Sequence, residues 1–349
     1  MDFELYSRLF EKKAAQEGYT PDEIDDLLVY AEGLYQNKLP IIYDQEHFAR
    51  LVGFKLSYLL AISNSQRHFY HTFKIPKRKG GYRSIAQPLP NLKLVQNWIL
   101  NNILNPGSTL LVHSAATAFM TGKSLYDNVS LHQGKNKIVA LDIEDFFGNV
   151  KFVQVYGVFR RLGYKRDVSV LLGKLCTLRN ALPQGAPTSP MLSNMVLYRI
   201  DGQLSGYCIR RGITYTRYAD DLTFSGDDFE TGLLIRHVRY LINRQFSLNE
   251  DKTKIMGRAN AQYVTGVVVN EKAQVPRKYR ERIRQEIYFI QQYGLEHHFS
   301  KVKGLPVWID TPEVYLHHLI GKIYYVLQIN PQDTEFVEYK RYLRDLEKQ

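Results

Sequence analysis

The sequence predicts an α+β protein in which antiparallel strands carrying acidic residues lie between two helical regions. Residues 71–86 and 213–225 each alternate polar and apolar residues around a short turn, as β-hairpins do. Residues 137–141 form a short apolar run that is typical of a buried strand. The chain before residue 66 and after Gly266 shows instead the wider apolar spacing of helices.

The composition favours a polyanionic partner. The 349 residues carry a formal net charge of +11, and nucleic acid is the commonest partner for such a surplus, although a basic surface kept for solubility is the alternative. Cys176 and Cys208 do not form a CxxC pair, so we expect buried thiols rather than a disulfide framework or a zinc site. No run approaches the roughly 20 apolar residues of a membrane span, and no signal peptide is visible. We therefore expect a soluble, cytoplasmic protein without a membrane partner.

The individual elements follow from local signals. Residues 1–65 are predicted to be helical, with Thr20 as an N-cap and Pro21 at the first helical position. The hairpin at 71–86 turns through a basic, glycine-bearing loop, and a helix is expected over 91–104. A further helix begins at Phe152 and ends at Gly163.

Three carboxylates are the strongest chemical signal. Asp220 lies at the tip of the 213–225 hairpin, Asp221 follows it, and Asp142 ends the strand at 137–141. Adjacent carboxylates among β-branched and aromatic residues are costly unless a cation neutralises them. A lone DD pair is more often a solvated turn, and a lone strand-end Asp is often a helix cap. Together, three carboxylates on adjacent strands suit two Mg²⁺ ions about 4 Å apart.

This combination, with the motif Tyr218-Ala219-Asp220-Asp221 downstream of Asp142, resembles the reverse transcriptases. The resemblance implies an RNA-directed DNA polymerase that uses dNTPs. Its two Mg²⁺ ions would be held by the three carboxylates and the backbone carbonyl of Ile143. Phe147, five residues after Asp142, takes the place of the aromatic gate that excludes a ribose 2′-OH.

Three further segments extend the resemblance, although each alone would be an ordinary basic turn, loop or surface lysine. Residues 74–85 resemble the fingers hairpin, where Arg83 and either Lys74 or Lys77 would grip the triphosphate. Residues 182–190 resemble the LPQGxxxSP segment, in which Gln184 would contact the nucleotide or template and Gly185 would permit close backbone approach. Residues 248–254 place Lys252 where a lysine protonates or stabilises pyrophosphate.

Two short motifs resemble the retron branch of the family. Val264-Thr265-Gly266 stands where retron reverse transcriptases carry a Val-Thr-Gly. Asn128 and His132 match the Asn-Ala-x-x-His motif, with Val129 in place of its Ala. The resemblance implies that these residues bind nucleic acid.

The C-terminal part is helical and basic. Arg277, Lys278, Arg280 and Arg284 surround an apolar stripe, as in a helix that lies along a duplex and releases counterions. A solvated helix face is the alternative.

A retron enzyme would have defined partners. The resemblance implies a structured noncoding RNA template, a branched RNA-linked DNA product (msDNA), dNTPs, an effector protein in antiphage defence, and host RNase H acting on the hybrid. Its setting would be the bacterial cytoplasm. Alternatives are a group II intron-like reverse transcriptase, a defence polymerase that needs no template, and a nucleic-acid-binding scaffold for an effector.

The predicted architecture is therefore a right-hand polymerase with an antiparallel palm sheet. We expect a helical N-terminal segment over 1–65, fingers over 66–135, and a palm over 136–270. Fingers elements interleave with the palm at about 165–200, and a helical, basic thumb covers 271–349.

Overall fold

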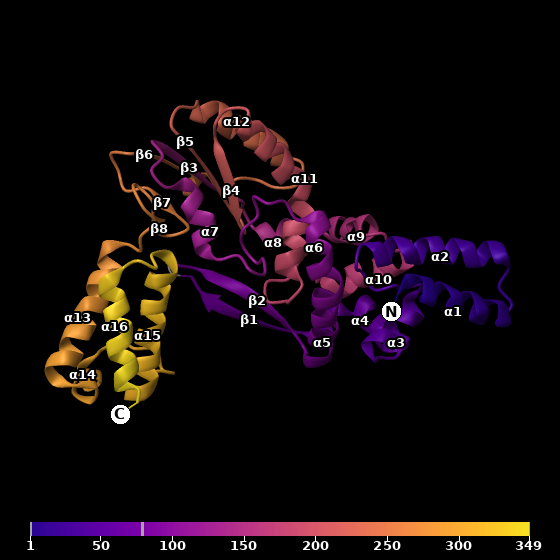
Figure 1. Ribbon diagram of the computed structural model, residues 1–349, viewed down its shortest axis with the longest axis horizontal. Coiled ribbons are helices and arrows are strands. Elements are labelled where there is room, and N and C mark those ends of the chain that lie inside the picture. Colours follow the sequence, from indigo (N-terminus) through magenta and orange to yellow (C-terminus); the bar gives the residue numbers. More distant parts are fainter. Residues whose placement is uncertain (1, 78–79, 349) are drawn as a thin grey trace. The chain divides into compact units, whose positions relative to one another are not determined.

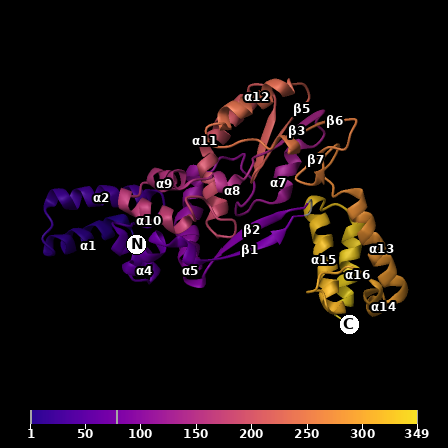
Figure 2. The ribbon, with the colours of Figure 1, turned by 180° about the vertical axis from the view of Figure 1, so that it is seen from behind.

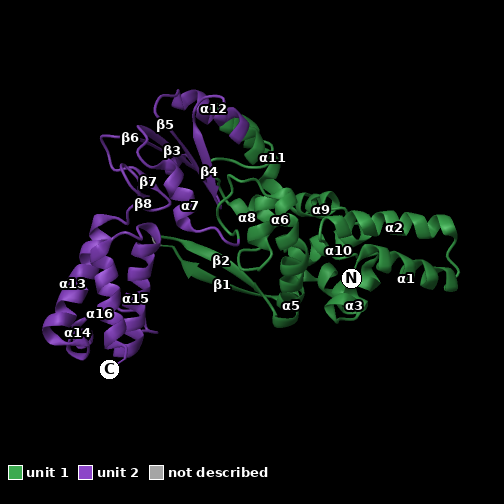
Figure 3. Cartoon of the chain, viewed as in Figure 1, with its two compact units in different colours: residues 1–120, 143–204, 236–248 green, residues 121–142, 205–235, 249–349 purple. Residues whose placement is uncertain are grey.

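The computed structural model describes residues 2–77 and 80–348, and Figure 1 shows its helices and strands. The chain divides into two compact units (Figure 3). Unit 1 comprises the chain up to residue 120 with residues 143–204 and 236–248, and unit 2 comprises residues 121–142, 205–235 and 249 onward. This division is coarser than the four predicted segments, whose boundaries stay predictions.

Unit 1 begins with four helices, as predicted for residues 1–65. Thr20 caps the second helix by accepting from the backbone N–H of Glu23, whose carboxylate accepts in return from the Thr20 N–H. Pro21 takes the first helical position, so both predicted start signals are confirmed. The four helices are α1 (Phe3–Gln16), α2 (Pro21–Gln36), α3 (Gln45–Val52) and α4 (Leu56–Asn64).

The predicted basic hairpin is an antiparallel pair of β1 (Tyr70–Pro76) and β2 (Tyr82–Pro88). Arg78 and Lys79 of its turn lie outside the described residues. The predicted helix over 91–104 is present as α5 and a following π-helical turn, and its apolar face is buried. The remaining elements of unit 1 are α5 (Pro90–Ile99), η2 (Leu100–Leu104), α6 (Asn105–Leu111), α8 (Phe146–Asn149), α9 (Phe152–Arg161), α10 (Arg166–Cys176) and the greater part of α11 (Ser189–Ile209).

Unit 2 contains a four-stranded antiparallel sheet in the order β4-β5-β3-β6. Its strands are β3 (Lys137–Asp142), β4 (Thr214–Tyr218), β5 (Asp221–Gly226) and β6 (Lys254–Gly257). The predicted strand at 137–141 and the predicted hairpin at 213–225 are therefore confirmed. Strand β3 lies inside the sheet between β5 and β6, and its side chains Ile138, Val139 and Leu141 are buried. The short helix α7 (Leu125–Val129) precedes β3. Helix α12 (Thr231–Ile242) follows β5, and its greater part belongs to unit 1.

The C-terminal helices of unit 2 pack around an apolar core that also contains Val129 of α7, Ile138 of β3 and Met256 of β6. They are α13 (Arg277–Tyr293), α14 (Leu295–Lys301), α15 (Pro312–Ile329) and α16 (Thr334–Leu346), and Figures 1 and 2 show α13, α15 and α16 side by side. The prediction that helix starts directly after Gly266 is wrong, because β8 (Val267–Val268) first pairs with β7 (Tyr263–Val264). None of the helices in the described part of the chain has the length and apolar character needed to cross a membrane.

The two cysteines are buried and not joined by a disulfide, as predicted. Burial raises the pKa of both thiols to about 12. They are therefore inert packing residues rather than nucleophiles.

Candidate active site

The hairpin of β4 and β5 presents two adjacent acids at its tip. Ala219 adopts a φ of 58°, the left-handed conformation that a two-residue hairpin loop requires. The side chain of Arg217, which is fully buried, donates from Nη1 to the Ala219 carbonyl at 3.1 Å. Arg217 was not a predicted site residue, although an arginine within a run of strand-forming residues was a visible signal. It fixes the turn that carries Asp220 and Asp221.

The strand register brings the upstream acid to the same place. Asp142, the last residue of β3, pairs directly with Asp221, the first residue of β5. Directly paired residues on antiparallel strands project to the same face, with their Cβ atoms about 5 Å apart. Asp142 is only 6% exposed. Burial, followed by the charges of Asp220 and Asp142, raises the pKa of Asp221 to about 6. The site therefore carries more negative charge than it readily holds.

Lys252 contacts this cluster from a short helical turn, Glu250–Lys252. Its Nζ donates to both carboxylate oxygens of Asp142, at 2.9 and 2.8 Å. This bond is the main reason that the pKa of Lys252 is raised. The turn itself is anchored because the Asn249 N–H donates to the Asp142 carbonyl at 2.8 Å. Lys252, predicted from its segment alone, is thus placed beside the predicted acids.

The donor set suits a hard divalent cation, because all three acids offer oxygen and the raised pKa of Asp221 marks a surplus of negative charge. Among the described residues, no three His, Cys, Asp or Glu side chains already converge on one point. Side-chain rotation would therefore be needed to complete a metal site. Ile143, the predicted carbonyl ligand, is buried and follows Asp142 in the chain.

In unit 1, the two phenylalanines of α8 have different environments. Phe146 is 4% exposed and packs against Phe246, as expected of a core aromatic. Phe147 is only partly buried, with its ring centroid 5.4 Å from that of Phe146. The exposed part of its ring is what a gate residue would use.

The register of β1 and β2 distinguishes the two candidate lysines. Arg83 pairs with Ile75, and Lys74 pairs with Ser84, so Lys74 and Arg83 project to opposite faces of the hairpin. The Lys77 N–H donates to the Gly81 carbonyl at 2.9 Å, which continues the ladder and places Lys77 on the face of Arg83. The pair that could grip one phosphate chain is therefore Lys77 with Arg83. All three side chains are exposed.

The loop before α11 is bonded to β2. The Ala86 N–H donates to the Gln184 carbonyl at 2.7 Å, and Gly185 has a φ of 121°. A Cβ on Gly185 would lie 2.8 Å from the Ala86 carbonyl oxygen. The close approach that requires this glycine is thus made to β2, whereas the sequence suggested an approach to substrate. The Gln184 side chain is partly exposed.

The chain is similar in sequence to known proteins. Residues 75–279 match the family described as "Reverse transcriptase (RNA-dependent DNA polymerase)". The Retron Mx65 reverse transcriptase of Myxococcus xanthus is 34% identical over 341 residues, covering 90% of this chain and 75% of that protein. The Retron Ec86 reverse transcriptase of Escherichia coli is 34% identical over 257 residues, covering 72% and 79%. The chain belongs to the retron reverse transcriptases.

The protein is accordingly an RNA-directed DNA polymerase with the right-hand fold, as predicted. Among solved structures, the telomerase of Candida albicans in complex with a fragment of telomeric RNA is similar, with a TM-score of 0.46 and 10% identity. That similarity covers 77% of this chain and 55% of the telomerase.

The retron-type motifs of this reverse transcriptase are largely internal. Asn128 and His132 are fully buried, and Val264 is 1% exposed, so the expectation that they touch nucleic acid does not agree with their positions. Thr265 and Gly266 form the turn between β7 and β8, both with positive φ, and retain exposed surface. Of the five residues predicted from these motifs, Thr265 and Gly266 are the two that remain accessible to a nucleic acid.

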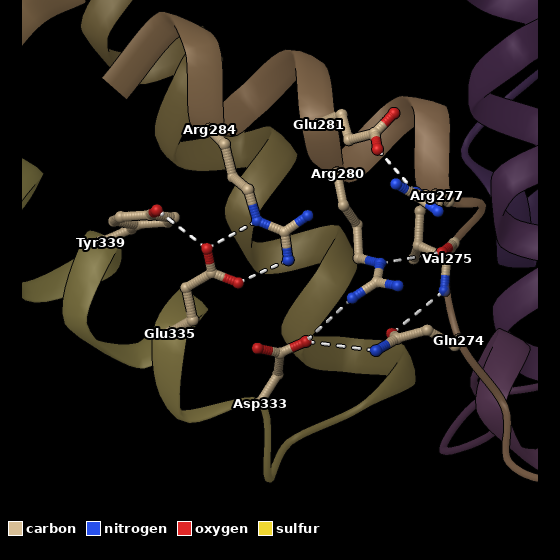
Figure 4. Close-up of polar contacts among 9 residues, drawn as sticks. All are labelled: Gln274, Val275, Arg277, Arg280, Glu281, Arg284, Asp333, Glu335 and Tyr339. Atoms are coloured by element: carbon tan, nitrogen blue, oxygen red, sulfur yellow. Dashed lines mark hydrogen bonds and ion pairs between the residues drawn. The ribbon is translucent and has the colours of Figure 1, made fainter. Parts of the chain in front are cut away.

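The basic residues of the reverse transcriptase's C-terminal helices also separate into two groups (Figure 4). Arg284 makes a two-point pair with Glu335, with both N–O distances at 2.6 Å. Arg280 donates to the Val275 carbonyl and lies 3.8 Å from Asp333. These two arginines join α13 to α16 and to the turn before it. Because their guanidinium groups already bind acids of the protein, this arrangement does not agree with the expected contact to a duplex.

Two of the four predicted basic residues stay at the surface of α13. Arg277 is exposed and pairs with Glu281, one turn further along the same helix, at 2.6 Å. Lys278 is exposed as well. An exposed pair within one helix is worth a few tenths of a kcal/mol, so a phosphate could replace Glu281 at little cost.

Proposed function

We propose that this polymerase copies a structured noncoding RNA into branched, RNA-linked single-stranded DNA, by two-metal nucleotidyl transfer, as part of an antiphage defence unit. The observation that carries the proposal is the direct pairing of Asp142 with Asp221, beside Asp220 at the hairpin tip. Retron relatives at 34% identity support the choice of template class.

The three acids would hold two Mg²⁺ ions, in keeping with the divalent-metal dependence general among reverse transcriptases. When bound, such ions lower the pKa of an attacking hydroxyl and neutralise charge on the transferred phosphate. The protein contributes the geometry, because the sheet fixes Asp142 opposite Asp221. Lys252 would leave Asp142 and donate a proton or charge to the departing pyrophosphate.

The incoming dNTP would be held by groups of unit 1. Lys77 and Arg83, on one face of the β1–β2 hairpin, suit the triphosphate, since guanidinium and ammonium groups bind phosphate oxygens strongly. The partly exposed ring of Phe147 would exclude a ribose 2′-OH, and the Gln184 side chain would contact the nucleotide or template.

The proposed wider setting is the one that the resemblance to retron reverse transcriptases implies. The template would be a noncoding RNA specific to this enzyme, and host RNase H would trim the hybrid. An effector protein would use the enzyme and its DNA product together. The two buried, unpaired thiols and the bacterial origin of the relatives support a location of the enzyme in the bacterial cytoplasm. A pure scaffold would need none of the acids, so their loss separates the two functions.

The test is primer extension by the purified protein on an RNA template with dNTPs and Mg²⁺. Wild type and the Asp220→Asn/Asp221→Asn double variant are compared, and RNA that co-purifies with the protein is assayed for branched DNA. We expect synthesis that the double variant abolishes. Synthesis that survives in the double variant would remove the proposed site, and exclusively unbranched products on co-purified RNA would remove the msDNA assignment.

A further inference from the structure

The segment of residues 125–134 contains α7 and leads into β3, and it bonds to the acid-bearing hairpin through His132. The imidazole of His132 lies between two hydroxyls, with Nδ1 2.6 Å from Ser225 Oγ and Nε2 2.8 Å from Thr216 Oγ1. Its burial lowers the pKa to about 3, so the ring is neutral and uses one nitrogen as donor and the other as acceptor. The ring therefore joins β4 to β5.

The bonded hydroxyls share a face of the sheet with the acids. Thr216 pairs with Thr223, and Tyr218 pairs with Asp221. Because side chains alternate along a strand, Thr216 and Ser225 project to the face that carries Asp221 and Asp142. A displacement of His132 would therefore reach the acids through the strands that carry them.

The same segment bonds to the chain that leads into α13. Asn128 Nδ2 donates to Thr265 Oγ1 at 3.2 Å, in the β7–β8 turn. The Ala273 N–H donates to the Gln133 side-chain oxygen at 3.0 Å, and the Gly134 N–H donates to the Val269 carbonyl at 3.0 Å. Three contacts thus attach the segment to residues 265–273.

Apolar packing continues the connection into the C-terminal helices. Val129 is fully buried in the core that contains Ile283 and Ile287 of α13 and Leu319 of α15, and Leu125 packs against that core. Helix α7 lies in contact with α15. The segment therefore belongs to the helical core through its apolar side and to the sheet through His132.

We propose that residues 125–134 are a coupling element that sets the catalytic hairpin relative to the C-terminal helices, with His132 and Asn128 as positioning residues. The inference rests on the proposed catalytic role of Asp220 and Asp221. It replaces the expected contact of these two residues with nucleic acid. Its consequence is that a duplex end held by the C-terminal helices is presented to the acids at a fixed position.

The experiment measures three quantities for each variant: melting temperature, the rate of single-nucleotide incorporation from a preformed complex, and product length per binding event. Asn128→Ala and Thr265→Val remove one shared bond, and Thr265→Val preserves side-chain shape. We expect each to shorten products several-fold while the single-nucleotide rate changes less than about twofold. Because the bond is shared, the double variant should be no worse than the more severe of the two single variants.

His132 is tested with Leu and Gln. We expect His132→Leu to lower the single-nucleotide rate by about tenfold or more, since a lost hydrogen-bond pair is commonly worth one factor of ten. His132→Gln, which keeps a donor and an acceptor, should restore much of that rate. Should His132→Leu not fold, Thr216→Val and Ser225→Ala carry the same test from the opposite side of the bond. Leu131→Ala is the matched control, because Leu131 lies in the same segment and is 54% exposed.

The coupling itself has a direct readout in amide hydrogen exchange. In Thr265→Val, which changes a side chain in the β7–β8 turn, exchange should rise in residues 214–226. A lowered melting temperature with unchanged rates, product lengths and exchange would overturn the proposal and leave a purely structural segment. A loss of RNA affinity with a shallower salt dependence would overturn it in favour of direct contact. Full synthesis by Asp220→Asn/Asp221→Asn would instead count against the proposed function.

Discussion

Two acids of unit 2, Asp221 and Glu335, show opposite uses of charge. Burial and the neighbouring Asp220 and Asp142 raise the pKa of Asp221 to about 6. The bond from Arg284 lowers the pKa of Glu335. The carboxylates of the sheet therefore repel one another, and a cation could relieve this repulsion. In the helices, the carboxylate of Glu335 is already paired with Arg284. Surplus charge indicates the reacting centre, and paired charge indicates architecture.

The largest expected effect separates activity from stability at the acids. Asp221→Asn should lower DNA synthesis by about a thousandfold or more, because charge stabilisation at the reacting phosphate is among the largest catalytic terms. The same change should leave the melting temperature equal or higher, since it relieves repulsion. Primer extension and thermal melting measured on one preparation check both. A large loss of stability would mean that Asp221 serves the fold.

The second prediction uses pH at the buried His132. Its folded-state pKa of about 3 lies below the ordinary 6.5, so the unfolded chain binds the extra proton first. Stability from this group is complete above pH 6.5 and is lost as pH falls, by about 2 kcal/mol between pH 6.5 and pH 5. Denaturant unfolding should show this slope in wild type and a weaker one in His132→Gln. Equal slopes would mean that the ring is accessible to protons in the folded protein.

The third prediction breaks the paired charge of the helices. Arg284→Gln should lower the free energy of unfolding by about 1 kcal/mol, because the pair is roughly one-third exposed and screening reduces its worth. Affinity for an RNA–DNA duplex should change little. Arg282→Gln, an exposed neighbour on α13, is the control for removal of a charge. A larger loss of duplex affinity for Arg284→Gln than for Arg282→Gln would assign Arg284 to the nucleic acid.

The smallest expected effect concerns Lys252. Its ammonium group occupies both oxygens of Asp142, so it competes with a metal ion for that ligand. Lys252→Gln should raise Mg²⁺ affinity several-fold, because a competing charge worth about 1 kcal/mol is removed. Titration calorimetry of the enzyme without nucleic acid measures this separately from synthesis. Weaker Mg²⁺ binding in Lys252→Gln would show that Lys252 supports the metal site.

The sequence predicted those parts that depend on local patterns. Alternation located β3 and the β4–β5 hairpin, and the capping signals at Thr20 located α2. The motifs located the acids and Lys252, which the structure places together. Local spacing could not reveal that His132 is enclosed by Thr216 and Ser225, because that contact joins segments far apart in the chain.

The same limit applied to the basic residues. Arg280 and Arg284 have the spacing of a duplex-binding face, but their partners come from the start of α16 and the turn before it. Nothing in the periodicity of α13 indicates that distant acids will meet it. The sequence therefore located the basic residues of α13 correctly, but it did not reveal which of them are paired with acids of the protein.

The bond between Ala86 and Gln184 has a kinetic consequence. This bond joins the loop at 182–190 to β2, and Gly185 packs directly against the backbone of Ala86. We therefore expect the two segments to move together. Any closure of the β1–β2 hairpin onto a nucleotide must carry Gln184 with it. We expect the enzyme to recognise the base and bind the phosphates in a single cooperative step, so that a mismatched nucleotide is bound weakly through both its base and its triphosphate.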